Sequence, residues 1–198
     1  MIVRRRKYSF TVLLLAFVLV VPVRAATSHM ALCFSLQQLS IDGHTNVNTF
    51  WLKYARNNSP LISSDFSTQQ ESLFAVSIPV NEFVFSNHLM KHDFLSMIHA
   101  DQYPDIRIQL KDLQKIASFQ KDSTDVVNVD ITLAGIKRSV SVVCNIDKGD
   151  ECHFDVTGTK AMKLSDFELI PPAKFFGLVK VNDDIVIHFE IRLILHNN

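Results

Sequence analysis

The residues with the clearest chemical potential are two histidines four positions apart. His88 and His92 lie within the segment 87–95, and Asp93 follows directly. On a helix this spacing puts both imidazoles on one face, an arrangement that can bind a divalent metal ion. The first question is therefore whether this segment is a metal site.

A third ligand for such a site could come from His99 or Asp101. The competing interpretation is a solvated helix face capped by Ser86 or Asn87. No glutamate lies between the two histidines to act as a base, so the H-E-x-x-H pattern of metalloproteases is missing. We favour the solvated face, and we predict no metal and no cofactor.

The other polar residues that stand out fit turns better than catalysis. Asp166 is expected to cap a turn, and Asp183-Asp184 to form a hairpin turn. Lys137-Arg138 could meet a ligand phosphate, although a solvated turn is the simpler interpretation. The chain has no G-x-S-x-G and no phosphate-cradling glycine loop. The sequence therefore predicts that the protein is not an enzyme.

Most of the chain has the two-residue rhythm of β-strands. The clearest case is the last strand, where His188, Glu190 and Arg192 alternate with an apolar row. That row is Ile185, Ile187, Phe189, Ile191, Leu193 and Leu195. Such alternation means one dry face and one wet face. Several such rows at short intervals favour an antiparallel sandwich or closed barrel, and the length of the last row favours an elongated barrel.

One segment interrupts the β rhythm. Apolar residues between 87 and 95 recur at helical spacing. Tyr103-Pro104 then ends the helical pattern, because a residue before proline avoids the helical region. A strand resumes at Ile106. We predict turns at Asp42-Gly43, at Gly135 and at Asn182-Asp183-Asp184.

The first 25 residues have the layout of a secretory signal peptide. Arg4, Arg5, Arg6 and Lys7 precede an apolar run over 10–23, and Ala25 offers a cleavage position. The alternative is a retained membrane anchor, but the run is short of the ~20 residues that a spanning helix needs. We expect residues 1–25 to be removed, leaving 26–198 as one domain with no membrane span. The location would be periplasmic or secreted.

Removal of this segment changes the charge. The chain has 20 basic and 20 acidic residues, and residues 1–25 hold five of the basic ones and none of the acidic ones. The remaining 15 basic and 20 acidic residues give a net charge of −5. This balance argues against nucleic-acid binding. The sequence shows no linker or repeat that would mark a second domain.

Three cysteines are present in a chain expected to meet an oxidising compartment. Cys144 and Cys152 flank the turn signal over 147–150. A three-residue loop would place them directly opposite each other, close enough for a disulfide. The alternative is two free thiols. Cys33 is left over, and we expect it to be a small buried side chain.

Four stretches in order resemble the YceI-like family. They are HLMKHDFL with YPDIRIQL over 88–110, DITLAGIKRSV over 130–140, GTKAMKLSDFEL over 158–169, and more weakly SIDGHTNV over 40–47. The resemblance extends over 40–195. It implies a mostly β fold, an extended antiparallel lipocalin-like β-barrel of about eight strands with a short helical insertion. In the best-known members the apolar interior holds a polyisoprenoid chain.

The resemblance also suggests a function for the apolar rows. From the sequence alone, an ordinary packed core accounts for these rows and for the 15 phenylalanines. The resemblance instead favours a cavity for an isoprenoid-type lipid, with a filled, ligand-free structural or interaction barrel as the alternative. The expected lining is Phe74, Val76, Ile78, Ile106, Ile108, Val129, Ile131, Leu133, Phe154, Val156, Ile187, Phe189 and Ile191. His88, Lys91 and His92 are expected at the rim, near the ligand's head group. The sequence leaves open a homodimer.

Overall fold

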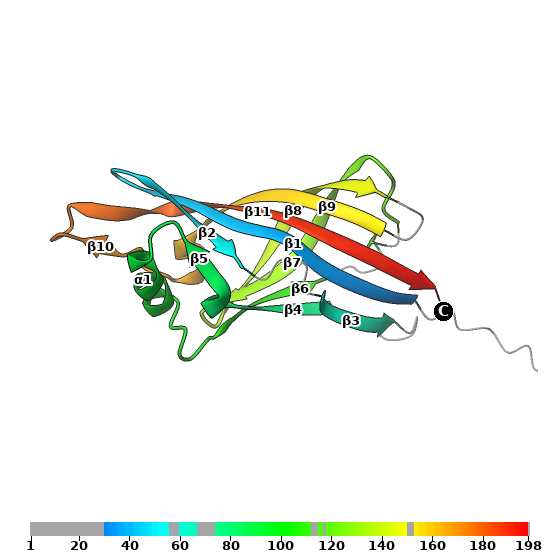
Figure 1. Cartoon of the computed structure of the whole chain (residues 1–198), viewed down its shortest axis with the longest axis horizontal. Helices are drawn as coiled ribbons and strands as arrows, with labels where there is room; N and C mark the ends of the chain where they lie inside the picture. Colours follow the sequence, from blue (N-terminus) through cyan, green and yellow to red (C-terminus); the bar gives the residue numbers. More distant parts are fainter. Residues whose placement is uncertain are drawn as a thin grey trace, which may run out of the picture.

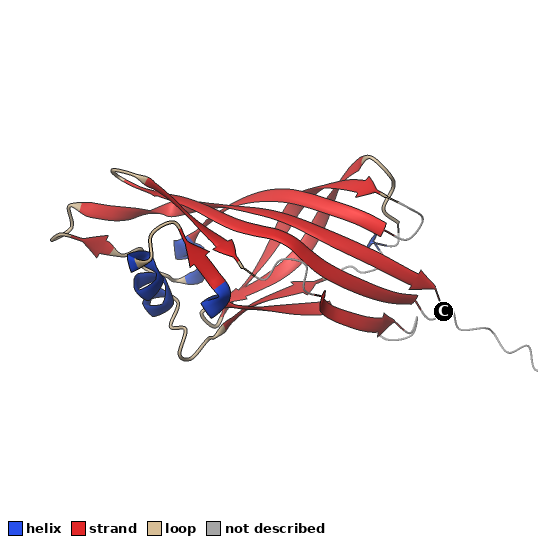
Figure 2. Ribbon diagram, in the orientation of Figure 1, coloured by secondary structure: helices blue, strands red, loops and turns tan. Residues whose placement is uncertain are grey.

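A computed structural model describes residues 30–55, 60–66, 74–111, 115–116, 118–149 and 153–197. Most of this part of the chain is strand (Figures 1 and 2). The strands are β1 Met30–Thr45, β2 Thr49–Tyr54, β3 Pro60–Phe66, β4 Phe74–Pro79, β5 Phe83–Phe85, β6 Asp105–Leu110, β7 Ser123–Leu133, β8 Ile136–Lys148, β9 His153–Lys163, β10 Ala173–Lys174 and β11 Val179–Asn197. The helical elements are η1 Val80–Glu82, α1 Leu89–Met97 and η2 Leu164–Phe167. None of these helices is long and apolar enough to cross a membrane.

The strands form one antiparallel sheet that curls into a nearly closed barrel. Its order is β4-β6-β7-β8-β9-β11-β1-β2-β5, while β3 pairs with the first half of β1 and β10 with β11. The mostly β, lipocalin-like barrel with a short helical insertion is thus confirmed, with nine strands on the main path rather than about eight. Among the described strands no ladder joins β4 to β5, the two ends of that path. In the described part of the barrel, the seam between β4 and β5 is therefore not hydrogen-bonded.

The longest ladder joins the two ends of the described chain. β1 pairs with β11 from Met30 opposite Asn197 to Thr45 opposite Val181. The register shifts between Leu36 and Gln38, so one extra residue of β1 forms a bulge there. A second shift follows Gly43.

The turn predicted at Asp42-Gly43 is wrong. β1 continues to Thr45, and the reversal lies after it, where the Thr45 hydroxyl accepts hydrogen bonds from the backbone of Val47 and Asn48. Gly43 is needed for a different reason. A Cβ there would lie 2.4 Å from the Phe50 ring, which crosses the strand at this point. Gly43 therefore leaves space for the Phe50 ring and does not form a backbone turn.

The turn predicted over 182–184 is also wrong, because these residues lie inside β11. The reversal occurs earlier, over residues 175–178, between β10 and β11. Asp183 instead accepts hydrogen bonds from the backbone N–H and the hydroxyl of Ser165, at 2.8 and 2.6 Å. Its carboxylate thereby anchors η2 to β11.

Three other local predictions are confirmed. Ala134 and Gly135 form the tight turn between β7 and β8, both with positive φ. The helical segment becomes α1, and β6 starts directly after Tyr103-Pro104. Asp166 accepts a hydrogen bond from the backbone N–H of Lys163, so it caps η2 as expected.

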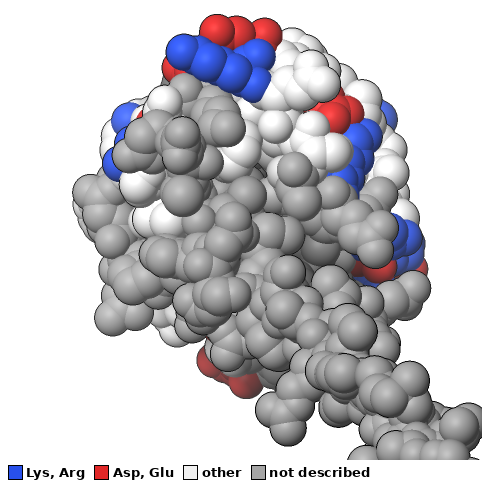
Figure 3. All heavy atoms as spheres, turned by 90° about the vertical axis from the view of Figure 1, so that its right-hand side faces the viewer, with Lys and Arg blue, Asp and Glu red and all other residues white. Residues whose placement is uncertain are grey.

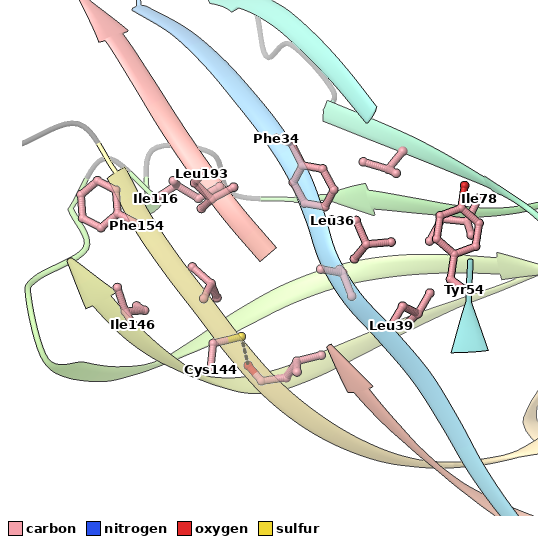
Figure 4. Close-up of a cluster of buried hydrophobic side chains, with 14 of the residues drawn as sticks. Phe34, Leu36, Leu39, Tyr54, Ile78, Ile116, Cys144, Ile146, Phe154 and Leu193 are labelled. Atoms are coloured by element: carbon pink, nitrogen blue, oxygen red, sulfur yellow. Dashed lines mark hydrogen bonds between the residues drawn. The ribbon is translucent and has the colours of Figure 1, made fainter. Parts of the chain in front are cut away.

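Two groups of buried side chains fill the interior. The larger lies inside the barrel and draws on nearly every strand; Figure 4 shows its members pointing toward one another. The smaller lies where α1 and η2 cover one end of the barrel. Its buried members are Val80, Ile98, Met162, Leu164, Phe167 and Leu169. The helical insertion therefore closes an end of the barrel with apolar contacts.

The disulfide predicted between Cys144 and Cys152 rests on a register that the structure does not have. β8 and β9 pair Lys148 with Phe154, which places Cys144 opposite Gly158. Cys144 is a free, buried cysteine, and burial raises the pKa of its thiol to about 11, so it stays neutral. Cys152 lies outside the described residues, as does the side chain of Cys33.

Lysine or arginine side chains lie next to aspartate or glutamate side chains at the edges of the end-on view in Figure 3. Asp130 is the buried member of one such cluster. Its carboxylate lies 2.8 Å from Lys137 Nζ and 2.9 Å from Lys111 Nζ, and it accepts a 2.6 Å hydrogen bond from the Ser139 hydroxyl. Hydrogen bonds from Lys137, Ser139 and Lys111 hold the pKa of Asp130 well below its usual range. The cluster ties β7 to β8 and to the end of β6.

We expect Asp130→Asn to lower the melting temperature at neutral pH. A carboxylate whose pKa falls on folding stabilises the folded state above its unfolded pKa of about 4, and that stabilisation is lost as pH falls through the folded pKa. The gap between wild type and variant should therefore narrow below about pH 4. Thermal unfolding followed by circular dichroism tests this, with the exposed Asp101→Asn as control. A gap that stays constant down to acid pH would contradict it.

Candidate ligand-binding cavity

A cavity of about 170 Å³ lies inside the barrel, and its exposed wall is entirely apolar. The lining comes from β1, β4, β6, β7, β8, β9, β11 and the short segment between β6 and β7. Lys160 contributes only its aliphatic stem, because its ammonium donates a 2.8 Å hydrogen bond to the backbone oxygen of Ser141. With no polar group facing it, this space suits a hydrocarbon and offers nothing to a polar substrate.

Most of the predicted lining residues face this cavity. They are Val76, Ile78, Ile106, Ile108, Val129, Ile131, Val156, Ile187, Phe189 and Ile191. Phe154 is buried but packs on Phe119 instead, with ring centroids 6.3 Å apart. Leu133 packs against the smaller cluster at the closed end, and the side chain of Phe74 lies outside the described residues. Their role in ligand binding stays a prediction.

Sequence reasoning missed the contribution of the first strand. Phe34 and Leu36 line the cavity, and so do Leu39 and Ile41. The two pairs have opposite parity, so simple alternation does not group them. The bulge between Leu36 and Gln38 shifts the phase by one residue and brings both pairs to the same face.

Several other lining residues were also missed. Val142, Cys144 and Leu193 belong to apolar rows that the sequence does reveal, so the signal for them was present. Ile116 and Phe119 come from the irregular segment after β6, where no periodicity marks them. The remaining lining residues are Leu110, Val127 and Met162.

A glycine sets the width of the cavity at one point. Gly158 lies opposite Phe189 in the β9–β11 ladder and opposite Cys144 in the β8–β9 ladder. A Cβ on Gly158 would lie 2.3 Å from the Phe189 ring, so the ring lies across the glycine. The absence of a side chain lets Phe189 fold against the wall instead of standing in the cavity.

The predicted rim residues lie away from the cavity. His88, Lys91 and His92 are exposed on or beside α1, and none of them lines the cavity wall. Lys91 Nζ donates to the backbone oxygen of Asn81 at 3.1 Å, and His92 Nδ1 lies 3.8 Å from Asp93. The structure therefore does not bring these three side chains to the cavity.

The buried side of α1 explains the position of the helix. Phe94 packs against Phe83 and Phe85, with ring centroids 6.2 and 5.4 Å apart, and Ile98 is almost fully buried. The helix thus covers the closed end. In the described part of the chain, no three His, Cys, Asp or Glu side chains gather as metal ligands.

Fold and cavity together define a class of protein, an elongated lipocalin-like β-barrel with a small apolar chamber. No protein-family model matches the sequence, and no curated protein matches it either. Solved structures do match the fold. A polyisoprenoid binding domain from Saccharophagus degradans, implicated in plant cell wall breakdown, aligns with a TM-score of 0.59 and 13% identity, over 82% of this chain and 98% of that chain.

Two further structures are similar. BcnA of Burkholderia cenocepacia aligns with a TM-score of 0.55 and 14% identity, over 78% of this chain and 94% of that one. The YCEI protein of Campylobacter jejuni aligns with a TM-score of 0.47 and 17% identity, over 64% and 72% of the two chains. The alignments with the Saccharophagus domain and with BcnA confirm the resemblance to YceI-like proteins at the level of the fold.

We expect Gly158→Ala to destabilise the protein by about 1–3 kcal/mol, because the new methyl group must displace the Phe189 ring. In a Phe189→Leu background the same substitution should cost less, since the ring is gone. Chemical denaturation of the wild type, the two single variants and the double variant measures the cost of Gly158→Ala with and without the ring. Gly149→Ala is the control, because a Cβ there would lie 3.7 Å from its nearest neighbour. Equal costs with and without the ring would refute the contact.

Proposed function

We propose that the protein binds a slender apolar lipid of the isoprenoid type inside the barrel. The observation that carries this proposal is the apolar cavity, to which seven strands and one connecting segment contribute side chains. Burial of each CH₂ group contributes roughly 0.8 kcal/mol, so a hydrocarbon chain needs no metal or covalent step to bind. The description of the Saccharophagus domain as polyisoprenoid binding supports the same ligand class.

The size of the cavity limits what it holds in this form. An apolar cavity of about 150 Å³ in another protein binds benzene, and the space here is about 170 Å³. It therefore accommodates a short apolar segment. A longer prenyl chain would require the barrel to widen, and the seam between β4 and β5 is where widening breaks no ladder hydrogen bond.

We further propose that the protein acts outside the cytoplasm. Residues 1–25 would direct export and be removed, and the remaining barrel would act in the periplasm or outside the cell as a carrier rather than an enzyme. Its oligomeric state, including the homodimer, stays a prediction.

Ligand binding is tested with a pair of neighbouring substitutions. Val142 lines the cavity and Val143 faces outward, 57% exposed. Val142→Phe should weaken binding of an isoprenoid quinone about tenfold or more, equivalent to about 1.4 kcal/mol or more, because the ring occupies the ligand's space. Val143→Phe should leave binding unchanged. Lipid extraction with mass spectrometry and titration with the quinone measure the effect.

A thermal melt establishes whether Val142→Phe is folded. If it is not, Ile131→Phe on the neighbouring strand repeats the test. Wild-type protein that yields no lipid on extraction and takes up no added quinone would favour a filled, ligand-free barrel.

Export is tested by the mass of the secreted protein, which we expect to begin at Ala26. Leu14→Arg should block processing, because an arginine at the centre of an apolar segment costs about 2.5–3.5 kcal/mol on insertion. A mature protein that still begins at Met1 would instead indicate a retained anchor.

A further inference from the structure

Exposed apolar side chains gather at the end of the barrel that α1 covers. Phe175 is 72% exposed and Phe176 fully exposed, both in the turn between β10 and β11. Leu178 lies in the same turn and Ile170 precedes β10, and both are also exposed. Figure 1 shows this hairpin projecting beyond the barrel. Apolar groups of this size are normally buried, so their concentration on one projection indicates a surface for another molecule.

The backbone of this turn is strained. Phe175 and Phe176 have φ angles of 52° and 57°, and the N–H of Gly177 donates to the oxygen of Lys174 at 3.1 Å. Phe175 and Phe176 are the first two residues of the four-residue turn 175–178, and such positions favour Asn or Gly, because bulky residues are disfavoured at positive φ. The chain therefore carries two large rings at positions that suit neither their backbone preference nor their solvent exposure. Strain of this kind is characteristic of functional positions.

The hairpin is held in place by its neighbours. The Asn46 side chain donates to the oxygen of Leu178 at 2.9 Å and accepts from the N–H of Lys180 at 3.0 Å, which fixes the β1–β2 turn against the hairpin. Val47, in that turn, is a further exposed apolar residue. On the other side, Lys174 Nζ lies 2.8 Å from Asp93 of α1. The exposed rings are thus presented by an ordered platform.

The hairpin itself carries basic side chains and no acidic one. Residues 170–182 include Lys174 and Lys180 and no acidic residue, although the whole chain has equal numbers of both signs. Lys174 pairs with Val179 and Lys180 with Ala173, so the two lysines lie on opposite faces of the hairpin, just behind the rings. Asp93 offsets part of the charge of Lys174. An apolar tip with lysines behind it matches a membrane interface, with rings among acyl chains and ammonium groups at lipid phosphates.

A protein partner fits the tip less well. Specific protein interfaces bury about 800 Å² on each side, which is more than a two-ring projection offers. A twofold contact between copies of this chain needs a self-complementary patch, whereas this tip is convex. A fluid bilayer adapts its shape to a narrow projection. The observations therefore favour lipid.

We propose that the β10–β11 hairpin docks the barrel on an anionic phospholipid bilayer, with Phe175 and Phe176 inserted at the interface. The hairpin is separate from the cavity lining, so the proposal does not depend on what the cavity holds. It assigns the strained turn a role that the fold itself does not require.

The test uses the double substitution Phe175→Asn with Phe176→Gly, which gives the turn its preferred residues. Exported protein is sedimented with vesicles of phosphatidylcholine and phosphatidylglycerol. We expect the double variant to lose about tenfold or more in vesicle partitioning, because two aromatic rings no longer insert. Its melting temperature should stay equal or rise, since the turn strain is relieved. Binding of the wild type should weaken with added salt and on neutral vesicles.

Val143→Ser is the matched control, because it removes an exposed apolar side chain from the side of the barrel. It should bind vesicles like the wild type. Wild-type protein that does not sediment with the vesicles, or a double variant that partitions equally well, would overturn the proposal. So would a concentration-dependent dimer that the double substitution abolishes while vesicle binding is absent. Lipid extraction from the double variant should give the wild-type result, which separates this test from that of the cavity.

Discussion

The ladder between β1 and β11 is the interaction on which the rest of the barrel depends. It joins strands from the two ends of the described chain over nearly their whole lengths. The other described strands connect to this ladder through β1, which pairs with β2 and β3, or through β11, which pairs with β9 and β10. Pairing of such distant segments costs loop entropy before it contributes contacts. The cost is met by long apolar rows, because β11 alone places Ile187, Phe189, Ile191 and Leu193 against the interior.

Closure of a long barrel imposes a second constraint, which is room for side chains at the inner wall. Aromatic rings are accommodated by glycines on the facing strand, Phe189 against Gly158 and Phe50 against Gly43. The result is an interior with a small void rather than a uniform filling. The described helices α1 and η2 contribute at one end, where Ile98 of the α1 segment and Phe167 of η2 close the barrel with buried side chains.

Local pattern predicted the architecture well and the irregularities poorly. The alternation of Ile185 to Leu195 and the break at Tyr103-Pro104 gave the last strand and the edges of the insertion correctly, because each depends on neighbouring residues alone. Gly43 and Asp183 misled, since both residue types favour turns but act here through distant partners, a ring and η2. The bulge after Leu36 leaves no clear mark in composition, and the lining from β1 was missed altogether.

The cavity could be predicted from the sequence, whereas the hairpin tip could not. The inward-facing rows follow from the two-residue alternation of apolar residues, and the family resemblance suggested that they line a lipid cavity. The Phe175-Phe176 turn contains none of the residues that mark such a turn except the following Gly177, so the sequence predicted the reversal at 182–184 instead. Charge balance over the whole chain likewise hid the local excess of lysine near the tip.

The seam between β4 and β5 distinguishes this barrel from one whose strands are hydrogen-bonded around the full circumference. A barrel closed by hydrogen bonds has a fixed internal width, and a ligand must fit that width. Under the proposed function, the described wall would separate along this seam while each ladder stays intact, so the width of the cavity would follow the thickness of the lipid. The apolar lining would then select a ligand by its hydrophobicity more than by its shape.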